Sequence, residues 1–376
     1  MFRKWVAISV LAATLEQKVW IQTTRPIFPN LYIFIVGHPG VGKTRAIREG
    51  RAYYTKLPEP HIAPISLTFS SLVDALVRSK RQVIIPGTDP LDYNTMYIAP
   101  DEIGTFIHKY DKEMTDGLSA FYDPDRYSQE RRTNELKLAI ESPQVNILAG
   151  TTPQNLIDLM PDAAWGQGFT SRLIMVFSDE RFVGDDFAER PEIFSIDMMT
   201  DLNIINTLYG KFHITAEYRD AVNNWRQLGE PPTPSHPRLI HYTTRRRVTL
   251  YKLSMVAAID KGNALVLSKD DFNTALGWMI EAEETMPDIF KAGATNADAV
   301  AMDEIADFIK IADTGNGVNE KRIVSFARDK IPLHSILRIV EIMERSGMVY
   351  CCGREKRTQL RYYKVATSDE SASVLR

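Results

Sequence analysis

Residues 31 to 44 read Leu-Tyr-Ile-Phe-Ile-Val-Gly-His-Pro-Gly-Val-Gly-Lys-Thr, and this stretch decides the fold of the chain. The first six residues are all apolar, which is typical of a strand buried on both faces of a parallel sheet. A glycine-rich turn follows directly, and the residues from Thr44 to about Gly50 have the pattern of a helix. The order of strand, glycine loop and helix predicts a phosphate-binding loop.

Each part of this loop has a chemical reason. Its glycines let backbone N–H groups turn inward around a phosphate, at a helix N-terminus that favours anions. We expect Lys43 to reach the β and γ phosphate oxygens and the Thr44 hydroxyl to bind Mg²⁺. ATP and Mg²⁺ are therefore the predicted cofactors. The predicted binding residues are Gly37, His38, Pro39, Gly40, Val41, Gly42, Lys43 and Thr44.

Strands alternate with helices up to about residue 180. Short apolar runs predict further strands at residues 83 to 85, 96 to 99, 145 to 149 and 173 to 177. Helical patterns occupy residues 71 to 80, 102 to 110, 133 to 140 and 154 to 160. This alternation predicts that residues 1 to 180 form a three-layer α/β domain with a mainly parallel sheet.

The pattern changes after residue 180. Residues 181 to 294 read as helices without strands and predict a helical lid, clearest at 248 to 259 and 269 to 286. Residues 295 to 376 contain three helical stretches and a basic hairpin, which predict a winged helix-turn-helix. Residues 318 to 364 hold eleven Lys/Arg against five Asp/Glu, although the whole chain has a net charge of −3. This unit is therefore suited to a polyanion.

Two carboxylates follow the apolar run that ends near Ala99. Asp101 stands where a carboxylate holds Mg²⁺ beside a phosphate loop, and Glu102 is placed to polarise a water molecule as general base. The alternative is a pair of surface carboxylates at the end of a strand.

Thr152 and Arg172 are two further candidates. Thr152 follows an apolar strand that we expect between the two motif strands, where its hydroxyl would position the attacking water; the alternative is ordinary capping by threonine. Arg172 precedes the last strand of the domain and is placed to contact the γ-phosphate of a neighbouring subunit. A solvated surface arginine or an intramolecular salt bridge is the alternative.

Together these features resemble a AAA+ ATPase, and more narrowly the helicase-like ATPases of phage and prophage replication modules. The resemblance covers roughly residues 5 to 290. Besides the motifs above, it rests on Lys18-Val19-Trp20-Ile21, Phe121-Tyr122-Asp123, the segment from Ser66 to Leu72 and the segment from Gly168 to Leu173.

The resemblance implies a role for each matching residue. Lys43 and Thr44 match the first nucleotide motif, Asp101 and Glu102 the second, and Arg172 the arginine finger. Thr152 matches the first sensor, where this family commonly has Asn. The second sensor would come from the run Arg245-Arg246-Arg247, of which Arg246 is assigned to the nucleotide; a solvated basic turn is the alternative.

Three functions are compatible with this pattern. The first is a ring-forming ATPase, expected as a homohexamer, that translocates on or unwinds single-stranded or forked DNA in phage-type replication, together with replication proteins. The second is an initiator or helicase loader that uses ATP as an assembly switch, and the third is a AAA+ protein remodeller. The predicted DNA contacts, through phosphates and a recognition helix, are Arg131, Arg132, Arg338, Arg354, Lys356 and Arg357.

The cellular context follows from composition. The chain has two cysteines, Cys351 and Cys352, and their adjacency excludes a disulfide framework and predicts a reducing cytosol. The resemblance to phage and prophage ATPases implies that this is the cytosol of a bacterium or a phage-infected host. The apolar run at residues 5 to 13 resembles a signal peptide. Because Glu16 and Lys18 follow it and the expected ATPase core begins soon after, we expect it to belong to the folded domain. No apolar run reaches about 18 residues, so the sequence predicts no membrane-spanning helix.

Overall fold

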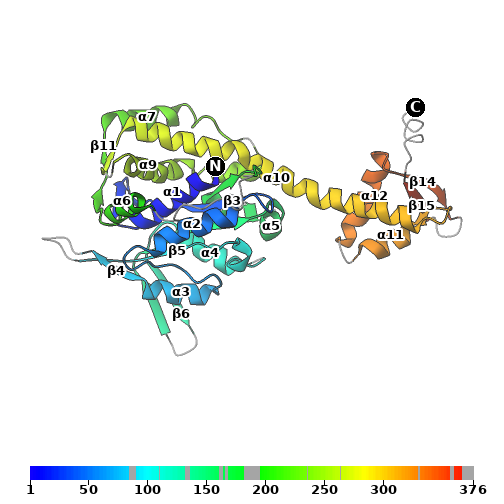
Figure 1. Cartoon of the computed structure of the whole chain (residues 1–376), viewed down its shortest axis with the longest axis horizontal. Coiled ribbons are helices and arrows are strands. Elements are labelled where there is room, and N and C mark those ends of the chain that lie inside the picture. Colours follow the sequence, from blue (N-terminus) through cyan, green and yellow to red (C-terminus); the bar gives the residue numbers. More distant parts are fainter. Residues whose placement is uncertain are drawn as a thin grey trace. The chain divides into compact units, whose positions relative to one another are not determined.

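The computed structural model describes most of the chain, and its elements are labelled in Figure 1. The chain forms two compact units, Met1–Phe290 and Lys291–Arg376, so the predicted nucleotide domain and the predicted lid lie in one unit. The described residues are 1 to 83, 90 to 109, 111 to 131, 136 to 160, 164 to 165, 168 to 181, 195 to 234, 236 to 262, 264 to 328, 331 to 355 and 360 to 365.

The centre of the first unit is a five-stranded sheet with the order β4-β5-β8-β3-β9. The neighbouring strands from β5 to β9 are parallel, and the edge strand β4 runs antiparallel to β5. This confirms the predicted α/β class with a mainly parallel sheet, and it places β8 between β5 and β3 as expected. The strands are β3 (Tyr32–Val36), β4 (Lys80–Val83), β5 (Leu91–Ile98), β8 (Pro143–Thr151) and β9 (Leu173–Phe177).

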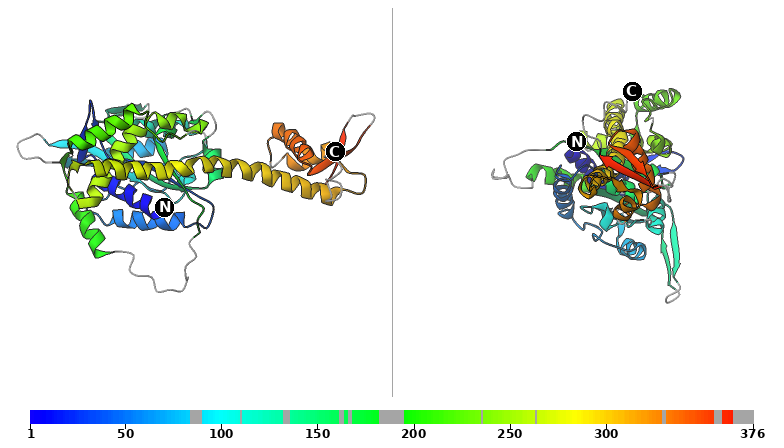
Figure 2. Two further views of the ribbon diagram at one scale, coloured as in Figure 1. Left: turned by 90° about the horizontal axis from the view of Figure 1, so that it is seen from above. Right: turned by 90° about the vertical axis from the view of Figure 1, so that its right-hand side faces the viewer.

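Helices cover both faces of this sheet. Every residue of β3 is buried, because side chains alternate along a strand and both faces are covered. On one face α1 (Phe2–Leu15) lies beside α2 (Lys43–Thr55), as Figure 2 shows. Gly50 of α2 permits this approach, since an added Cβ would lie 2.3 Å from Val6 Cγ1. On the other face, Tyr32 Oη donates 2.6 Å to the carbonyl of Leu118 in α4 (Lys112–Ala120).

Two helices predicted in this unit are wrong. Within the described residues 102 to 109 the helical structure is a 3-10 turn, Ile103–Thr105, and α4 begins only at Lys112. The segment 133 to 140 contains the strand β7 (Leu136–Ile140), which pairs antiparallel with β6 (Tyr127–Arg131). The apolar residues of β7 alternate, which is the strand period. The resulting hairpin extends away from the sheet in Figures 1 and 2.

The predicted lid is mainly helical but also contains short strands. Among its described residues, β10 (Gly210–Lys211) pairs with β1 (Val19–Gln22), which also pairs with β2 (Pro26–Ile27). β11 (His213–Ile214) pairs with β12 (Val266–Leu267). Two-residue strands leave almost no pattern in a sequence, and they were not predicted. The helices of this region are α6 (Ile196–Asn206), α7 (Ala216–Gln227), α8 (Ile240–Thr243) and α9 (Arg246–Gly262), followed by the start of α10.

Helix α10 (Lys269–Ala312) is one continuous helix where two were predicted, and it passes from the first unit into the second. In the second unit three short strands form an antiparallel sheet of order β13-β15-β14, which packs with helices around buried residues such as Ile309, Ile336 and Tyr363. The predicted hairpin is present, and β13 is an additional strand. The elements are β13 (Val318–Asn319), α11 (Glu320–Ala327), α12 (Leu333–Arg345), β14 (Val349–Arg354) and β15 (Arg361–Val365).

Candidate nucleotide-binding site

The glycine loop connects β3 to α2 at the carboxyl end of the central strand. Gly40 and Gly42 have φ angles of 85° and 87°, in the left-handed region that favours glycine. Gly37 is required for a different reason, because an added Cβ would lie 2.5 Å from the carbonyl oxygen of Ser178. The loop conformation therefore depends on all three predicted glycines.

The Lys43 side chain lies inside this loop. Its Nζ donates to the carbonyls of Gly37 at 2.6 Å and His38 at 2.8 Å, and the residue is buried. Burial lowers the pKa of Lys43, and the negative charge of Glu102 acts in the opposite direction. Thr44, the next residue, is exposed. The lysine is thus held where a phosphate bound by the loop would meet it.

The second motif lies at the same edge of the sheet. Because β3, β8 and β5 are parallel, their carboxyl ends all lead to this edge. Gly37 N donates to the carbonyl of Thr151 at 3.2 Å, and a Cβ added to Gly150 would lie 2.4 Å from the carbonyl oxygen of Asp101. The structure therefore brings together the loop, Asp101-Glu102 and the end of β8.

Asp101 is paired with two arginines of α2 that were not predicted. Arg48 Nη2 and Nε lie 2.6 Å and 2.7 Å from Asp101 Oδ2. Arg51 Nη2 lies 3.2 Å from Oδ1, while its Nη1 donates to the carbonyl of Ala99 at 2.8 Å. Thr44, Arg48 and Arg51 follow at i, i+4 and i+7, which is one face of a helix. This spacing, together with the acidic residues at the end of the neighbouring strand, is the pattern from which the Arg48 and Arg51 contacts with Asp101 could have been predicted.

The side chains near the loop fit a magnesium ion. Mg²⁺ in such sites is held by one or two protein groups, water and substrate phosphates. The exposed Thr44 lies one helical turn before Arg48 and two turns before Arg51, the two arginines that hold Asp101. Among the described residues no group of three or more His, Cys, Asp or Glu forms a metal site of its own. Asp101 would become available as a ligand when Arg48 and Arg51 release its carboxylate.

Thr152 has a structural role. Its Oγ1 accepts a hydrogen bond of 3.2 Å from Asn155 N and caps α5 (Pro153–Leu159), which is the capping alternative. Whether it also positions water stays a prediction. Asn155 Nδ2 lies 3.5 Å from Glu102 Oε1, a weak contact at that distance. Asn155, three residues beyond Thr152, thus brings a side-chain amide to the predicted general base.

Arg172 lies at the amino ends of the parallel strands, whereas the loop lies at their carboxyl ends. It directly precedes β9, whose first residue, Leu173, pairs with Tyr32 at the start of β3. Arg172 Nη1 donates to the carbonyl of Gly168 at 2.5 Å, and its Nη2 lies 3.3 Å from Asp123 Oδ2. An intramolecular salt bridge, one of the two alternatives, is therefore formed within the chain.

Arg246 does not have the predicted role. Its guanidinium is completely buried and forms an ion pair with Glu283 at 2.7 Å, with a second bond to the same carboxylate at 2.8 Å. It also donates to the carbonyls of Glu230 and Pro232 and stacks on Trp225. A side chain that is enclosed and bonded on all sides cannot reach a nucleotide, so the assignment of Arg246 is corrected to a structural one.

The predicted DNA contacts are only partly described. Arg131 belongs to strand β6, and Arg338 on α12 and Arg354 on β14 are exposed. Arg132, Lys356 and Arg357 lie outside the described residues.

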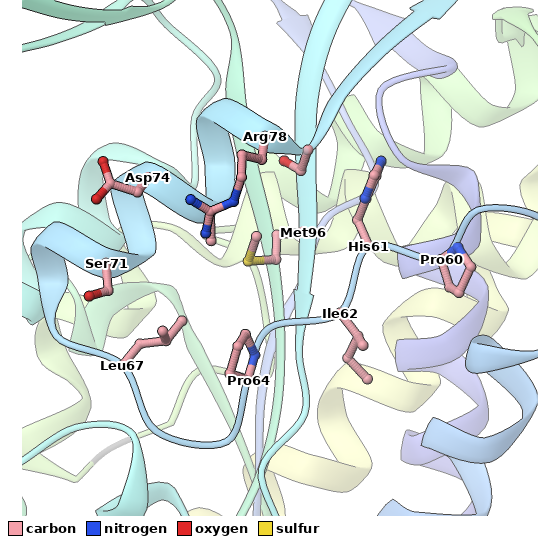
Figure 3. Close-up of a pocket in the computed structure, with 11 residues that line it drawn as sticks. Pro60, His61, Ile62, Pro64, Leu67, Ser71, Asp74, Arg78 and Met96 are labelled. Atoms are coloured by element: carbon pink, nitrogen blue, oxygen red, sulfur yellow. The ribbon is translucent and has the colours of Figure 1, made fainter.

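The first unit also contains a cavity of about 530 Å³, whose lining residues are shown in Figure 3. It is enclosed by the segment from Pro60 to Leu67, by α3 (Phe69–Arg78) and by Met96 of β5. None of the predicted nucleotide residues lines it. The cavity is therefore separate from the candidate site.

The chain matches no protein-family model, and no curated protein is significantly similar to it. Within the described part of the chain, no helix has the length and apolar character to cross a membrane. The site must therefore be interpreted from its own geometry.

Proposed function

We propose that this chain is an ATPase of the AAA+ type that assembles head to tail and acts on DNA as a helicase or translocase. The observation that carries the proposal is the convergence of the loop, Asp101-Glu102 and the end of β8 at one edge of a parallel sheet. Ligands of such sheets bind at the carboxyl ends of the strands.

The residues at this edge have complementary tasks in hydrolysis. The loop N–H groups and Lys43 bind the phosphates, and Glu102 accepts the proton of the water that attacks the γ-phosphorus as the bond to the β-phosphate oxygen breaks. Mg²⁺, when bound by Thr44 and Asp101, neutralises charge on the phosphates. The products are ADP and phosphate.

The β6–β7 hairpin supports an action on DNA. It stands in the chain between β5, which leads to Asp101-Glu102, and β8, which leads to Thr152. The hairpin is therefore inserted between the two strands that carry the candidate Asp101-Glu102 and Thr152. The hairpin carries Arg131, and Arg126 just before it has an exposed side chain. Basic side chains at such a position suit contacts with phosphates.

The second unit supports DNA binding by a separate observation. Among its described residues, α11, α12 and the end of α10 accompany an antiparallel sheet of order β13-β15-β14, which supports a winged helix. Arg338 is exposed on α12, the second helix after β13, which is where a recognition helix presents side chains to a groove. The same observation favours the alternative function, an initiator or loader that binds duplex DNA without unwinding it.

Nucleotide turnover with and without DNA tests the proposal. The wild-type chain should hydrolyse ATP, faster with single-stranded or forked DNA, and should displace a strand from a forked duplex. Lys43→Ala should abolish nucleotide binding, whereas Glu102→Gln should bind ATP and lose turnover by about 100-fold or more. Lys56→Ala, at the end of α2, is the matched control. Binding of DNA without displacement would support the loader, and no nucleotide binding by the wild type would refute the proposal.

A further inference from the structure

Two arginines from different parts of the first unit share one carboxylate oxygen. Arg172 Nη2 lies 3.3 Å and Arg245 Nη1 3.0 Å from Asp123 Oδ2. Arg172 ends the 3-10 turn Thr170–Arg172 that leads into β9, whereas Arg245 directly precedes helix α9 of the lid. The bound carboxylate oxygen thus marks a position at which both guanidinium groups can hold one anion.

The cluster has more positive than negative charge. Lys252 is also buried beside it, with its Nζ 4.1 Å from the ring centroid of Tyr122 and 2.5 Å from Asn30 Oδ1. Burial, together with the charges of Arg172 and Arg245, lowers the pKa of Lys252 to about 7, against the opposing effect of Asp123. Lys252 and Arg172 are largely buried, whereas the Arg245 side chain is 32% exposed; buried cations need compensating negative charge.

In the described part of the chain, the cluster has an unpaired donor, and its one carboxylate is exposed. The Arg172 side chain is 10% exposed, and its Nε is buried with no hydrogen-bond partner among the described residues. The Asp123 side chain, by contrast, is 55% exposed. Asp123 therefore lies on the solvent side of the cluster, where an incoming anion can replace it.

The anion cannot be the nucleotide of the same chain. The arginines lie at the amino end of the parallel strands and the phosphate loop at the carboxyl end. The five residues of β3 between these edges span about 16 Å at the usual rise per residue, which exceeds the reach of an arginine side chain. Any phosphate that this pair contacts must belong to another molecule.

We propose that Arg172 and Arg245 together receive the terminal phosphate of the nucleotide bound to a second copy of this chain, and that Asp123 holds them in place until the subunits assemble. The inference rests on the proposed ATPase function. It goes beyond that function because it assigns a lid arginine to the neighbouring subunit's site and gives Asp123 a positioning role. Two guanidinium groups match the several oxygens of a phosphate better than one carboxylate oxygen does.

Mixing two inactive variants tests this assignment. Arg245→Ala keeps an intact loop, and Lys43→Ala keeps intact arginines; each alone should hydrolyse ATP at least ~100-fold more slowly than wild type. If Arg245 acts between subunits, an equal mixture should recover up to about one quarter of the wild-type rate, the share of head-to-tail interfaces that combine the two intact halves. If Arg245 serves its own nucleotide, the mixture should stay as slow as its parents, which would overturn the inference.

A second readout does not depend on turnover. In the Glu102→Gln background, ATP-dependent association measured by sedimentation velocity should be weakened about tenfold or more by Arg245→Ala and by Arg245→Gln, which retains a hydrogen-bond donor near Asp123. The exposed lid residue Arg219 provides the control variant, Arg219→Ala, which should associate normally.

The outcomes separate the two proposals. A folded Arg245→Gln variant that associates and hydrolyses like wild type would overturn the inference alone. A wild-type chain that binds no nucleotide would overturn the ATPase proposal and this inference with it.

Discussion

At the residue scale, Asp101 lies near the loop as expected, but its carboxylate is paired with two arginines that were not expected there. The sequence predicted the loop glycines, Lys43, and the closeness of the Asp101-Glu102 pair to the loop, because these depend on local spacing along single elements. It did not predict the pairing of Asp101 with Arg48 and Arg51. Such pairing depends on how α2 is rotated against the end of β5, which no local pattern specifies.

Replacing Arg48 should make magnesium easier to bind. In the folded chain Arg48 competes for the Asp101 carboxylate, although its own side chain is 64% exposed. An exposed ion pair is weak, so Arg48→Ala should lower the Mg²⁺ concentration at half-saturation of ATP binding only about two- to fivefold. A fluorescent ATP analogue titrated with Mg²⁺ measures this midpoint.

The control for this titration lies on the same helix. Arg45 is paired with Glu49 and not with Asp101, so Arg45→Ala should leave the midpoint unchanged. An Arg48→Ala midpoint equal to or above that of wild type would mean that the arginine does not compete with the ion.

At the element scale, the mainly parallel sheet and the place of β8 between β5 and β3 were predicted from sequence, whereas the antiparallel edge strand β4 was not and two predicted helices are wrong. The parallel strands were recognisable because their residues are apolar without interruption. The segment with Leu136, Leu138 and Ile140 was read as helical although its apolar residues alternate. In so short a segment helical and strand spacings share several positions, and pairing with β6 decides the outcome.

The hairpin should contribute to DNA binding without affecting nucleotide. Arg126→Glu, at the base of β6, should weaken binding of single-stranded DNA and reduce the dependence of log affinity on log salt by about one. ATP affinity should not change. Fluorescence anisotropy at several salt concentrations measures both quantities.

A charge reversal elsewhere serves as the comparison for this variant. Arg25, exposed next to β2, should tolerate Arg25→Glu with no change in the salt dependence. Equal losses of DNA affinity in both variants would indicate a general electrostatic effect and would argue against a specific DNA contact by the hairpin.

At the scale of the whole molecule, the chain consists of two compact units with separate cores. The chain divides after Phe290, whereas the sequence predicts a third unit from residue 295, where the helical stretches that precede the basic hairpin begin. The continuity of α10 through Pro287 was not predicted, because an internal proline usually ends or bends a helix.

The two units should unfold separately, and only one should respond to nucleotide. In calorimetry of the Glu102→Gln variant, Mg²⁺ and ATP at 100 times the dissociation constant should stabilise the first unit by about 2.7 kcal/mol. The thermal unfolding transition of residues 291 to 376 should stay at the same temperature. Calorimetry of that segment expressed alone identifies which transition belongs to it. A single transition that shifts as a whole would indicate that α10 couples the two cores.

The separation of the phosphate loop and the Arg172–Arg245 pair across one sheet also determines how many complete catalytic centres an assembly of these chains can contain. On the proposed function each chain carries halves of two different catalytic centres, so an open row of subunits always has one centre fewer than it has chains. Only closure removes the unmatched ends. A ring opened at one interface to admit a DNA strand would lose a single centre there, and the remaining centres would stay complete.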